Sequence, residues 1–243
     1  MPSSRPRITF DSSGICNACN YKKEKEKINW DIRKKEFLEI CEKHRSKNGE
    51  YDCIVPWSGG KDSSSIAHKL KFIYKMNPLL VTWAPLIPSE IGNINRELLI
   101  DEGFDNIFFR PNQKISKYLC RRFFFERGNP KVHWDAGINA LPVKIAIEKN
   151  IKLIFYAEHG ESEYGGKIIG KDSDKIRNLE EVLENQIGDD PTNWIDENVT
   201  LNDLDPYRYP NENFIKESQI KAYYFAYFFK WDVFENYKYV KKN

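Results

Sequence analysis

The sequence has no apolar run of membrane-spanning length, and its polar N-terminal stretch lacks the hydrophobic core of a signal peptide. It also lacks an excess of charge of one sign, because 38 Lys and Arg residues against 36 Asp and Glu residues leave only +2. So small a net charge does not by itself indicate a membrane or nucleic-acid partner. The five cysteines form an odd set, and without an export signal we expect them to be reduced thiols or metal ligands. These features predict a cytoplasmic protein.

A composition of 40% hydrophobic and 30% charged residues over 243 residues is typical of a globular protein with one sizeable core. Apolar stretches of strand length alternate with amphipathic stretches of helix length. The predicted strands are 51–57, 78–83, 106–109 and 151–157, and the predicted helices are 29–46, 62–75, 94–102, 113–127 and 136–150. This alternation predicts an α/β fold with a parallel sheet covered on both faces. Such sheets bind ligands at the carboxyl ends of their strands, near a topological switch point.

The chain divides by composition into three predicted parts. Residues 1–28 form an irregular segment with a cysteine pair, and residues 29–172 form the α/β domain. Residues 173–243 form a helical and aromatic C-terminal extension, with a helix at 175–185 and a long Pro-, Asn- and Asp-rich excursion at 189–213. Within the extension, the strongly apolar stretch Ile220 to Asp232 is either a strand or a buried helix.

The stretch VPWSGGKDSSS, from Val55 to Ser65, follows the first predicted strand and opens a helix, as phosphate-binding turns do. It is not a Walker A loop, because that pattern requires a glycine where Val55 stands and a Ser or Thr where Asp62 stands. The remaining residues still suit a phosphate: Gly59 and Gly60 let the backbone approach it, and Lys61 supplies a positive charge. An acid beside a phosphate nest repels the ligand unless a cation lies between them, so Asp62 indicates Mg²⁺. Either Ser58 or Asp62 is positioned to cap the helix.

The pattern S-G-G-x-D-S after a first strand resembles the PP-loop of the N-type ATP pyrophosphatases, which have an adenine nucleotide alpha hydrolase-like, Rossmann-like fold. Members of that superfamily cleave ATP between its α and β phosphates, so that AMP activates a substrate oxygen and pyrophosphate leaves. The resemblance implies that ATP and Mg²⁺ bind at the loop and that Val81, Thr82 and Trp83 meet the adenine through backbone groups. For Trp83, simple packing is the alternative. The loop residues concerned are Ser58, Gly59, Gly60, Lys61, Asp62 and Ser63.

Four motifs in one order narrow the resemblance further: RPRITFDSSGICNAC from Arg5, the 58–63 loop, GFDNI from Gly103 and EHGESEYGG from Glu158. Together they resemble the N-acetyl sugar amidotransferases of bacterial surface-polysaccharide biosynthesis, including those linked to pseudaminic acid and B-band O-antigen sugars. The resemblance runs from Met1 to about Trp231. It implies that the chain adenylates an acetamido oxygen of a nucleotide- or lipid-linked sugar, and that ammonia from a separate glutaminase subunit then forms an acetamidino group.

Further site residues follow from position. Glu158 and Glu161, with Glu163, follow the fourth strand and are expected to face the same cleft, where they bind metal or the sugar; a solvated loop of charges is the alternative. Lys61, Asp62, Glu158 and Glu161 are the catalytic candidates. His159 is a candidate for deprotonating ammonia, although a surface histidine fits equally well. The other substrate-contact candidates are Asn95, Arg96, His133, Asp135, Tyr164, Gly165 and Gly166.

Cys16 and Cys19 form half of a zinc site, which needs four ligands. Cys41 and His44 have suitable spacing to complete it, but they share an apolar helix face with Phe37, which favours packing. Cys53, in a strand, and Cys120, in a helix, are interpreted as core residues. Relatives of the amidotransferase type carry a second Cys-x-x-Cys pair upstream and continue beyond the position of Asn243, which leaves open whether this chain is truncated and whether it binds zinc.

Two other functions remain as alternatives. A PP-loop tRNA-thiolating enzyme would need a basic surface and a catalytic cysteine near the cleft; the small net charge argues against it, although Lys22 to Lys27 could form a local patch. A non-catalytic ATP-binding partner of a sugar-modifying complex is the second alternative, and a truncated active site would favour it.

Overall fold

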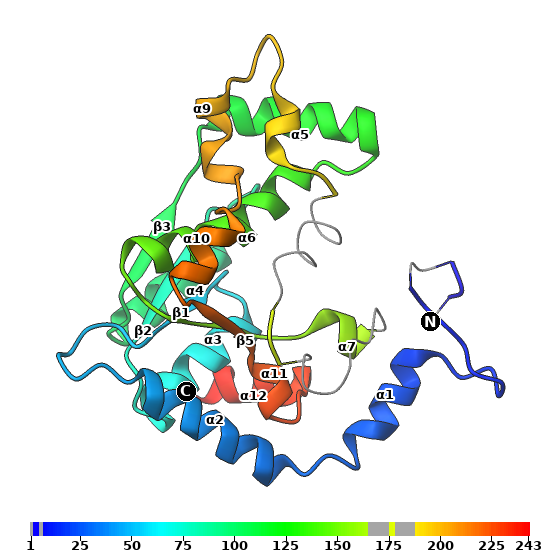
Figure 1. Ribbon diagram of the computed structural model, residues 1–243, viewed down its shortest axis with the longest axis vertical. Coiled ribbons are helices and arrows are strands. Elements are labelled where there is room, and N and C mark those ends of the chain that lie inside the picture. Colours follow the sequence, from blue (N-terminus) through cyan, green and yellow to red (C-terminus); the bar gives the residue numbers. More distant parts are fainter. Residues whose placement is uncertain (1, 5–6, 165–174, 178–187) are drawn as a thin grey trace.

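The computed structural model describes residues 2–4, 7–164, 175–177 and 188–243. At its centre lies a five-stranded parallel sheet with the order β3-β2-β1-β4-β5 (Figure 1). The strands are β1 (Cys53–Pro56), β2 (Pro78–Trp83), β3 (Asn106–Phe109), β4 (Leu153–Tyr156) and β5 (Lys221–Tyr224). The predicted α/β class and parallel sheet are therefore confirmed. The chain runs outward from β1 to β3 and then returns to β4 on the other side of β1, so the topological switch point lies between β1 and β4.

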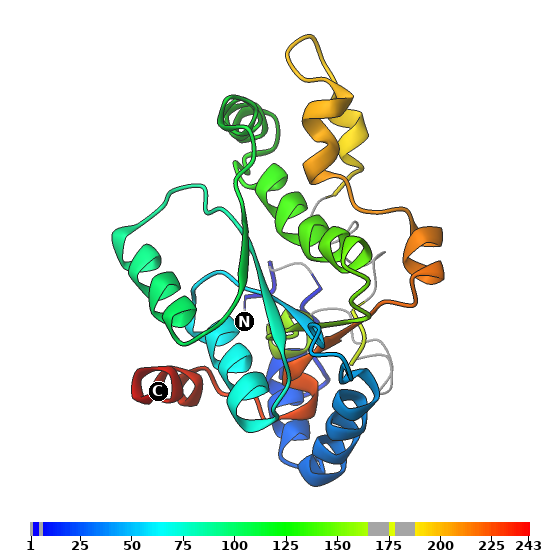
Figure 2. The ribbon, with the colours of Figure 1, turned by 90° about the vertical axis from the view of Figure 1, so that its left-hand side faces the viewer.

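The sheet is covered on both faces by helices (Figure 2). In β1 and β4, alternate residues enter opposite halves of the core. In β1, Ile54 belongs to the half formed with α5 (Gln113–Arg127) and α6 (Val132–Glu148). Its neighbours Cys53 and Val55 belong to the half formed with α2 (Trp30–His44) and α3 (Lys61–His68). All six residues of β2 are buried, which is why the strand is apolar at every position except Thr82.

The remaining helices surround this frame. They are α1 (Asn17–Lys25), the π-helical turn Lys69–Ile73 that continues α3, α4 (Glu90–Asp101), α7 (Gly160–Tyr164), the 3₁₀ turns η3 (Pro191–Trp194) and η4 (Asp205–Tyr207), α9 (Leu201–Leu204), α10 (Glu212–Glu217), α11 (Phe225–Phe228) and α12 (Val233–Lys242). The predicted start of α4 was four residues late, because Ser89 caps the helix by accepting a hydrogen bond from the Gly92 amide. The predicted cap of α3 was wrong: its N-cap is Gly60, with no side-chain cap.

The predicted C-terminal part contributes a strand to the central sheet, because β5 forms its edge next to β4. The apolar stretch from Ile220 contains both expected alternatives in succession, since β5 pairs with β4 and passes directly into α11. The predicted helix at 175–185 is not present at Lys175–Arg177, where Ile176 instead forms an antiparallel bridge with Tyr223. Its remaining positions, 178–187, lie outside the described residues.

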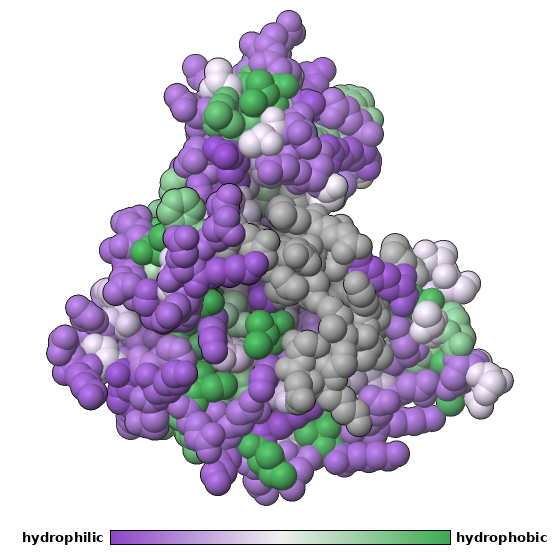
Figure 3. Space-filling view, in the orientation of Figure 1, coloured by the Kyte–Doolittle hydropathy of each residue, from purple (hydrophilic) through white to green (hydrophobic). Residues whose placement is uncertain are grey.

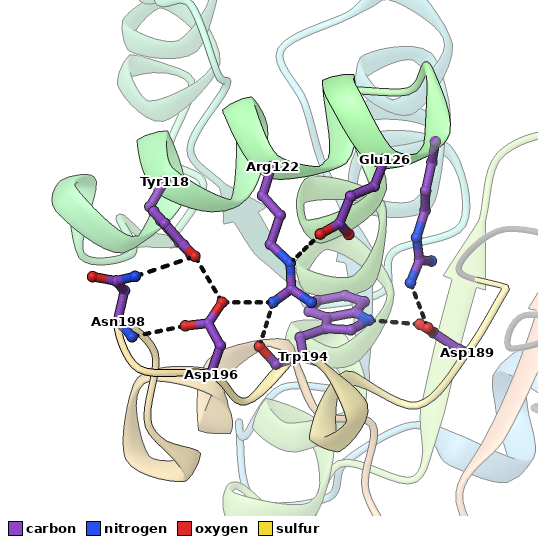
Figure 4. Close-up of polar contacts among 8 residues, drawn as sticks. Tyr118, Arg122, Glu126, Asp189, Trp194, Asp196 and Asn198 are labelled. Carbon is purple, nitrogen blue, oxygen red and sulfur yellow. Dashed lines mark hydrogen bonds and ion pairs between the residues drawn. The ribbon is translucent and has the colours of Figure 1, made fainter.

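The Asp-rich excursion is tied to α5 by a polar network (Figure 4). Arg122 of α5 donates to the Asp196 carboxylate at 2.9 Å and to the Trp194 carbonyl at 2.7 Å. Tyr118, one turn earlier, donates to the same carboxylate at 2.7 Å. Trp194 is fully buried, and its indole donates to Asp189 at 2.6 Å. These contacts fix the 189–196 segment against α5 despite its loop-like composition.

The surface is largely hydrophilic on the face shown in Figure 3, where hydrophobic residues form separate patches rather than a belt. None of the helices in the described ranges has the length and apolarity needed to cross a membrane.

Candidate functional site

The glycine loop at residues 58–60 connects the carboxyl end of β1 to the first turn of α3, next to the switch point. Gly59 has φ +78°, a conformation that side chains disfavour, so the turn requires glycine there. Trp57 holds one flank of the loop, because its indole donates to the Ser64 hydroxyl at 2.8 Å. The loop therefore directs the positive N-terminal end of α3 toward the edge of the sheet where parallel-sheet proteins bind ligands.

Lys61 and Asp62, in the first turn of α3, form an ion pair of 2.7 Å between Nζ and Oδ2. The second oxygen of Asp62 accepts a hydrogen bond of 3.2 Å from the side-chain amide of Asn236 on α12. Among the described residues, no group of three or more His, Cys, Asp or Glu side chains could hold a metal ion. One carboxylate still fits Mg²⁺, which commonly takes one or two carboxylates together with phosphate oxygens and water. Asp62 is thus suited to hold Mg²⁺ only in company with a bound phosphate.

A cavity of about 200 Å³, here named the strand-end cavity, lies over the carboxyl ends of β1, β2 and β4. Its lining consists of Pro56, Trp57, Ser58, Val81, Trp83, Trp134, Ile138, Asn139, Leu141, Pro142, Tyr156 and Arg177. Loop residue Ser58 and the predicted adenine contacts Val81 and Trp83 are therefore brought together. Thr82 faces elsewhere, since its hydroxyl accepts from Asn106 at 2.9 Å. The Val81 carbonyl already accepts the Trp57 amide at 2.8 Å, so it is engaged in the β1–β2 pairing.

The strand-end cavity also contains residues that sequence reasoning missed. Arg177 lies with its guanidinium 4.0 Å from the Tyr156 ring centroid, and it donates to the side-chain carbonyl of Asn139. Trp134 donates its indole N–H to the Ala84 carbonyl at 2.9 Å. Trp134, Ile138 and Leu141 stand at i, i+4 and i+7 on α6, a spacing that signals a shared helix face. Nothing in the sequence around Arg177 indicates that it turns back toward β4.

A second cavity, of about 390 Å³ and here named the loop-side cavity, lies between α3, α4 and α12. Gly59 and Lys61 of the loop line it, and so does Asn95 of α4. The structure thus places Asn95 near the loop, as a substrate contact requires. Arg96 does not join it in the lining, because its guanidinium lies 4.6 Å from the Phe108 ring and pairs with Glu97.

The prediction that His133 and Asp135 precede a helix is wrong, because both lie in the first turn of α6. His133 is 1% exposed and its Nε2 contacts the Ser116 hydroxyl at 3.1 Å. Burial lowers its pKa to about 4, so the ring is neutral at physiological pH. The predicted role of His133 at a cleft is therefore wrong. Asp135 pairs with Lys131 at 3.4 Å, and burial raises its pKa despite that partner. Asp135 lines neither cavity.

The acidic stretch after β4 is engaged in contacts with other elements. Glu163 accepts two hydrogen bonds from Lys25 of α1, at 2.8 and 2.9 Å, so it fixes the N-terminal helix rather than facing the loop. His159 stacks on Tyr224 with ring centroids 4.2 Å apart, and its Nδ1 contacts the Ser162 hydroxyl at 2.7 Å. Glu158 is partly exposed. The side chains of Glu161 and Tyr164, and the whole of Gly165 and Gly166, lie outside the described residues.

Within the part of the chain that the structure describes, the cysteines form no complete zinc site. Cys16 and Cys19 lie together, and the backbone amide and thiol of Cys19 lower the pKa of the Cys16 thiol. Cys41 does not join them: it is buried in the core with Phe37, and burial raises its pKa to about 12. Nδ1 of His44 forms a hydrogen bond of 2.8 Å with the backbone carbonyl oxygen of Ile40. The packing interpretation of Cys41 is confirmed, as is that of Cys53, which is fully buried, while Cys120 is only half-buried.

Comparison with known proteins adds little to this geometry. No protein-family model matches the chain. An uncharacterized protein of the archaeon Methanocaldococcus jannaschii is 38% identical over 74 residues, which is 30% of this chain and 26% of that protein. The matched segment spans about a quarter of that relative's length, so the similarity is local and carries no assigned activity.

Proposed function

We propose that this chain is an AMP-forming, ATP-dependent amidotransferase of the PP-loop type that adenylates the acetamido oxygen of an N-acetylated sugar. The single observation that supports it best is the position of the Ser58–Ser63 loop. A glycine turn with a lysine and an aspartate stands at the carboxyl end of the central strand, beside the switch point of a parallel sheet. The order of the surrounding motifs, which resembles the N-acetyl sugar amidotransferases, supplies the substrate class.

In this proposal the loop binds the phosphates of ATP. The amides at the start of α3 and the Lys61 ammonium attract negative charge, and Asp62 holds Mg²⁺ together with phosphate oxygens. An amide carbonyl is a poor electrophile, and transfer of AMP to its oxygen creates a leaving group that ammonia can displace. The aromatic strand-end cavity adjoins Ser58 and suits an adenine ring, with Trp83 and Trp134 as walls. A separate glutaminase subunit supplies the ammonia.

None of the five cysteines lines the strand-end or the loop-side cavity, which disfavours the tRNA-thiolating alternative. That alternative requires a thiol near the bound nucleotide. The non-catalytic ATP-binding partner remains the competing proposal, and product analysis separates the two.

The test is to incubate the purified chain with ATP, Mg²⁺, ammonium chloride and a panel of nucleotide-linked acetamido sugars, and to measure AMP and pyrophosphate. We expect both products in equal amounts, dependent on one sugar. Asp62→Ala should reduce the rate about 100-fold, the order of loss typical when a charge-stabilising group is removed. Asp31→Ala, at an exposed aspartate in the first turn of α2, is the matched control and should leave the rate unchanged.

Release of ADP and orthophosphate instead would refute the assignment of the loop. ATP binding without sugar-dependent pyrophosphate release would favour the non-catalytic partner. Binding of tRNA that weakens steeply with salt would revive the thiolating alternative.

A further inference from the structure

The C-terminal helix α12 lies against α3, the helix that begins at the glycine loop (Figure 2). Two side chains of α12 make the polar contacts between them. Tyr239 contacts Nδ1 of His68 through its hydroxyl at 2.8 Å. Asn236, one turn earlier and only 4% exposed, donates to Oδ1 of Asp62 at 3.2 Å. A residue far along the chain thus contacts the acid of the loop directly.

The orientation of the Asn236 side chain is fixed from both sides. Its amino group faces the Asp62 carboxylate, while its carbonyl oxygen accepts from the Lys69 ammonium at 3.4 Å. If the Asn236 amide were flipped, its oxygen would face the Asp62 carboxylate and its amino group would face the Lys69 ammonium. Both contacts would then be repulsive, so both favour the observed orientation. Lys69 is itself held in place, since its Nζ lies 4.7 Å from the Tyr239 ring centroid.

The two oxygens of Asp62 are thereby distinguished. Oδ1 is held by the buried amide of Asn236, whereas Oδ2 faces Lys61, whose side chain is 39% exposed. Lys61 is the partner that can turn to a phosphate, because its side chain is long, partly solvated and lines the loop-side cavity. Oδ2 is then the oxygen left for a cation.

We infer that Asn236 is a positioning residue for the proposed ATP site: it holds Asp62 so that Oδ2 faces the bound Mg²⁺ and phosphates. This inference rests on the proposed function, since it gives Asp62 the metal-holding role. It assigns to α12 a part in the site that no motif of the sequence indicates. A carboxylate free to rotate would have to be ordered each time the metal-nucleotide bound, and fixing it in advance removes that cost.

The test measures binding of a fluorescent ATP analogue to the full chain as a function of Mg²⁺ concentration. Asn236→Ala should raise the half-saturating Mg²⁺ concentration about tenfold, the effect expected on losing a hydrogen bond to a charged group. Binding of the analogue in excess EDTA should change less than twofold, because Lys61 and the loop amides remain. A purely structural role would weaken both measurements together.

Two further variants complete the design. Tyr239→Phe removes the other polar contact between α12 and α3 without touching Asp62, so it reports the effect of loosening the helix. Asn213→Ala makes the same chemical change at an exposed site on α10 and should have no effect. Circular dichroism and thermal unfolding confirm that each variant is folded before binding is compared.

The outcomes separate the inference from the proposed function. If the wild-type chain does not bind the analogue with Mg²⁺, both are overturned. If it binds but Asn236→Ala matches Asn213→Ala, or shifts the Mg²⁺ dependence no more than Tyr239→Phe does, only the positioning role is overturned. An Asn236→Ala variant that does not fold also counts against it, because Asn236 would then be needed for the core rather than for Asp62.

Discussion

The indole of Trp83, at the end of β2, occupies the space that any side chain on Gly137 of α6 would need. A Cβ placed on Gly137 would lie 2.3 Å from Cζ2 of Trp83, closer than carbon atoms can approach. Glycine in this helix therefore serves a close approach between helix and sheet, and it sets the position of a ring that lines the strand-end cavity.

Gly137→Ala should displace the Trp83 indole. Alanine favours the helix by up to about 1 kcal/mol, but overpacking typically costs about 1–3 kcal/mol, so we expect a net loss of roughly 1 kcal/mol and a lower Tm. Thermal unfolding measures the loss, and nucleotide titration should show weaker binding. Adding Trp83→Phe should recover part of the loss made by Gly137→Ala, because the smaller ring vacates that space. If the double variant loses as much stability as the two single variants lose in sum, the ring and Gly137 do not interact.

His133 should make the protein less stable in mild acid. Burial lowers its pKa from 6.5 to about 4, so between these pH values the unfolded chain binds a proton that the folded chain does not. The free energy of unfolding must then fall as pH falls from 6.5 toward 4, by up to about 3 kcal/mol from this residue, at 1.36 kcal/mol per pKa unit. Urea unfolding at pH 7.5, 6.5, 5.5 and 4.5 should show a flatter profile for His133→Gln than for the wild type. Parallel profiles would contradict the prediction.

The ion pair between Lys25 and Glu163 should hold α1 to α7. The two side chains are 10% and 13% exposed, and Lys25 also donates to the Trp231 carbonyl at 3.2 Å. Lys25→Ala leaves a nearly buried carboxylate without its partner, which typically costs about 3–5 kcal/mol. Hydrogen exchange should therefore accelerate across α1 and stay unchanged in β1 and β2. Lys23→Ala, at an exposed position of the same helix, is the control, and equal acceleration in both variants would contradict the role of the pair.

Much of the frame follows from local sequence patterns. The predicted bounds of β2, β3 and α5 agree with the structure, because each element is one unbroken strand or helix pattern whose flanking residues end it. Gly128, in the left-handed conformation, ends α5 as its position suggests. The predicted start of α6 is wrong because its N-cap residue, Lys131, has no capping side chain and so gives no start signal. The late start of the predicted helix is the reason that His133, a core residue, is predicted to line a cleft.

The candidate site was predictable only where it is local. The glycine loop, the strand before it and the helix after it follow from the sequence alone, since all three depend on neighbouring residues and on their φ and ψ preferences. In contrast, the contact of Glu163 with Lys25 depends on the complete fold, and so does the approach of Arg177 and Asn236 to the loop region. The Lys25–Glu163 and Asp62–Asn236 contacts join residues 138 and 174 positions apart. They form through packing of whole elements, which no local pattern records.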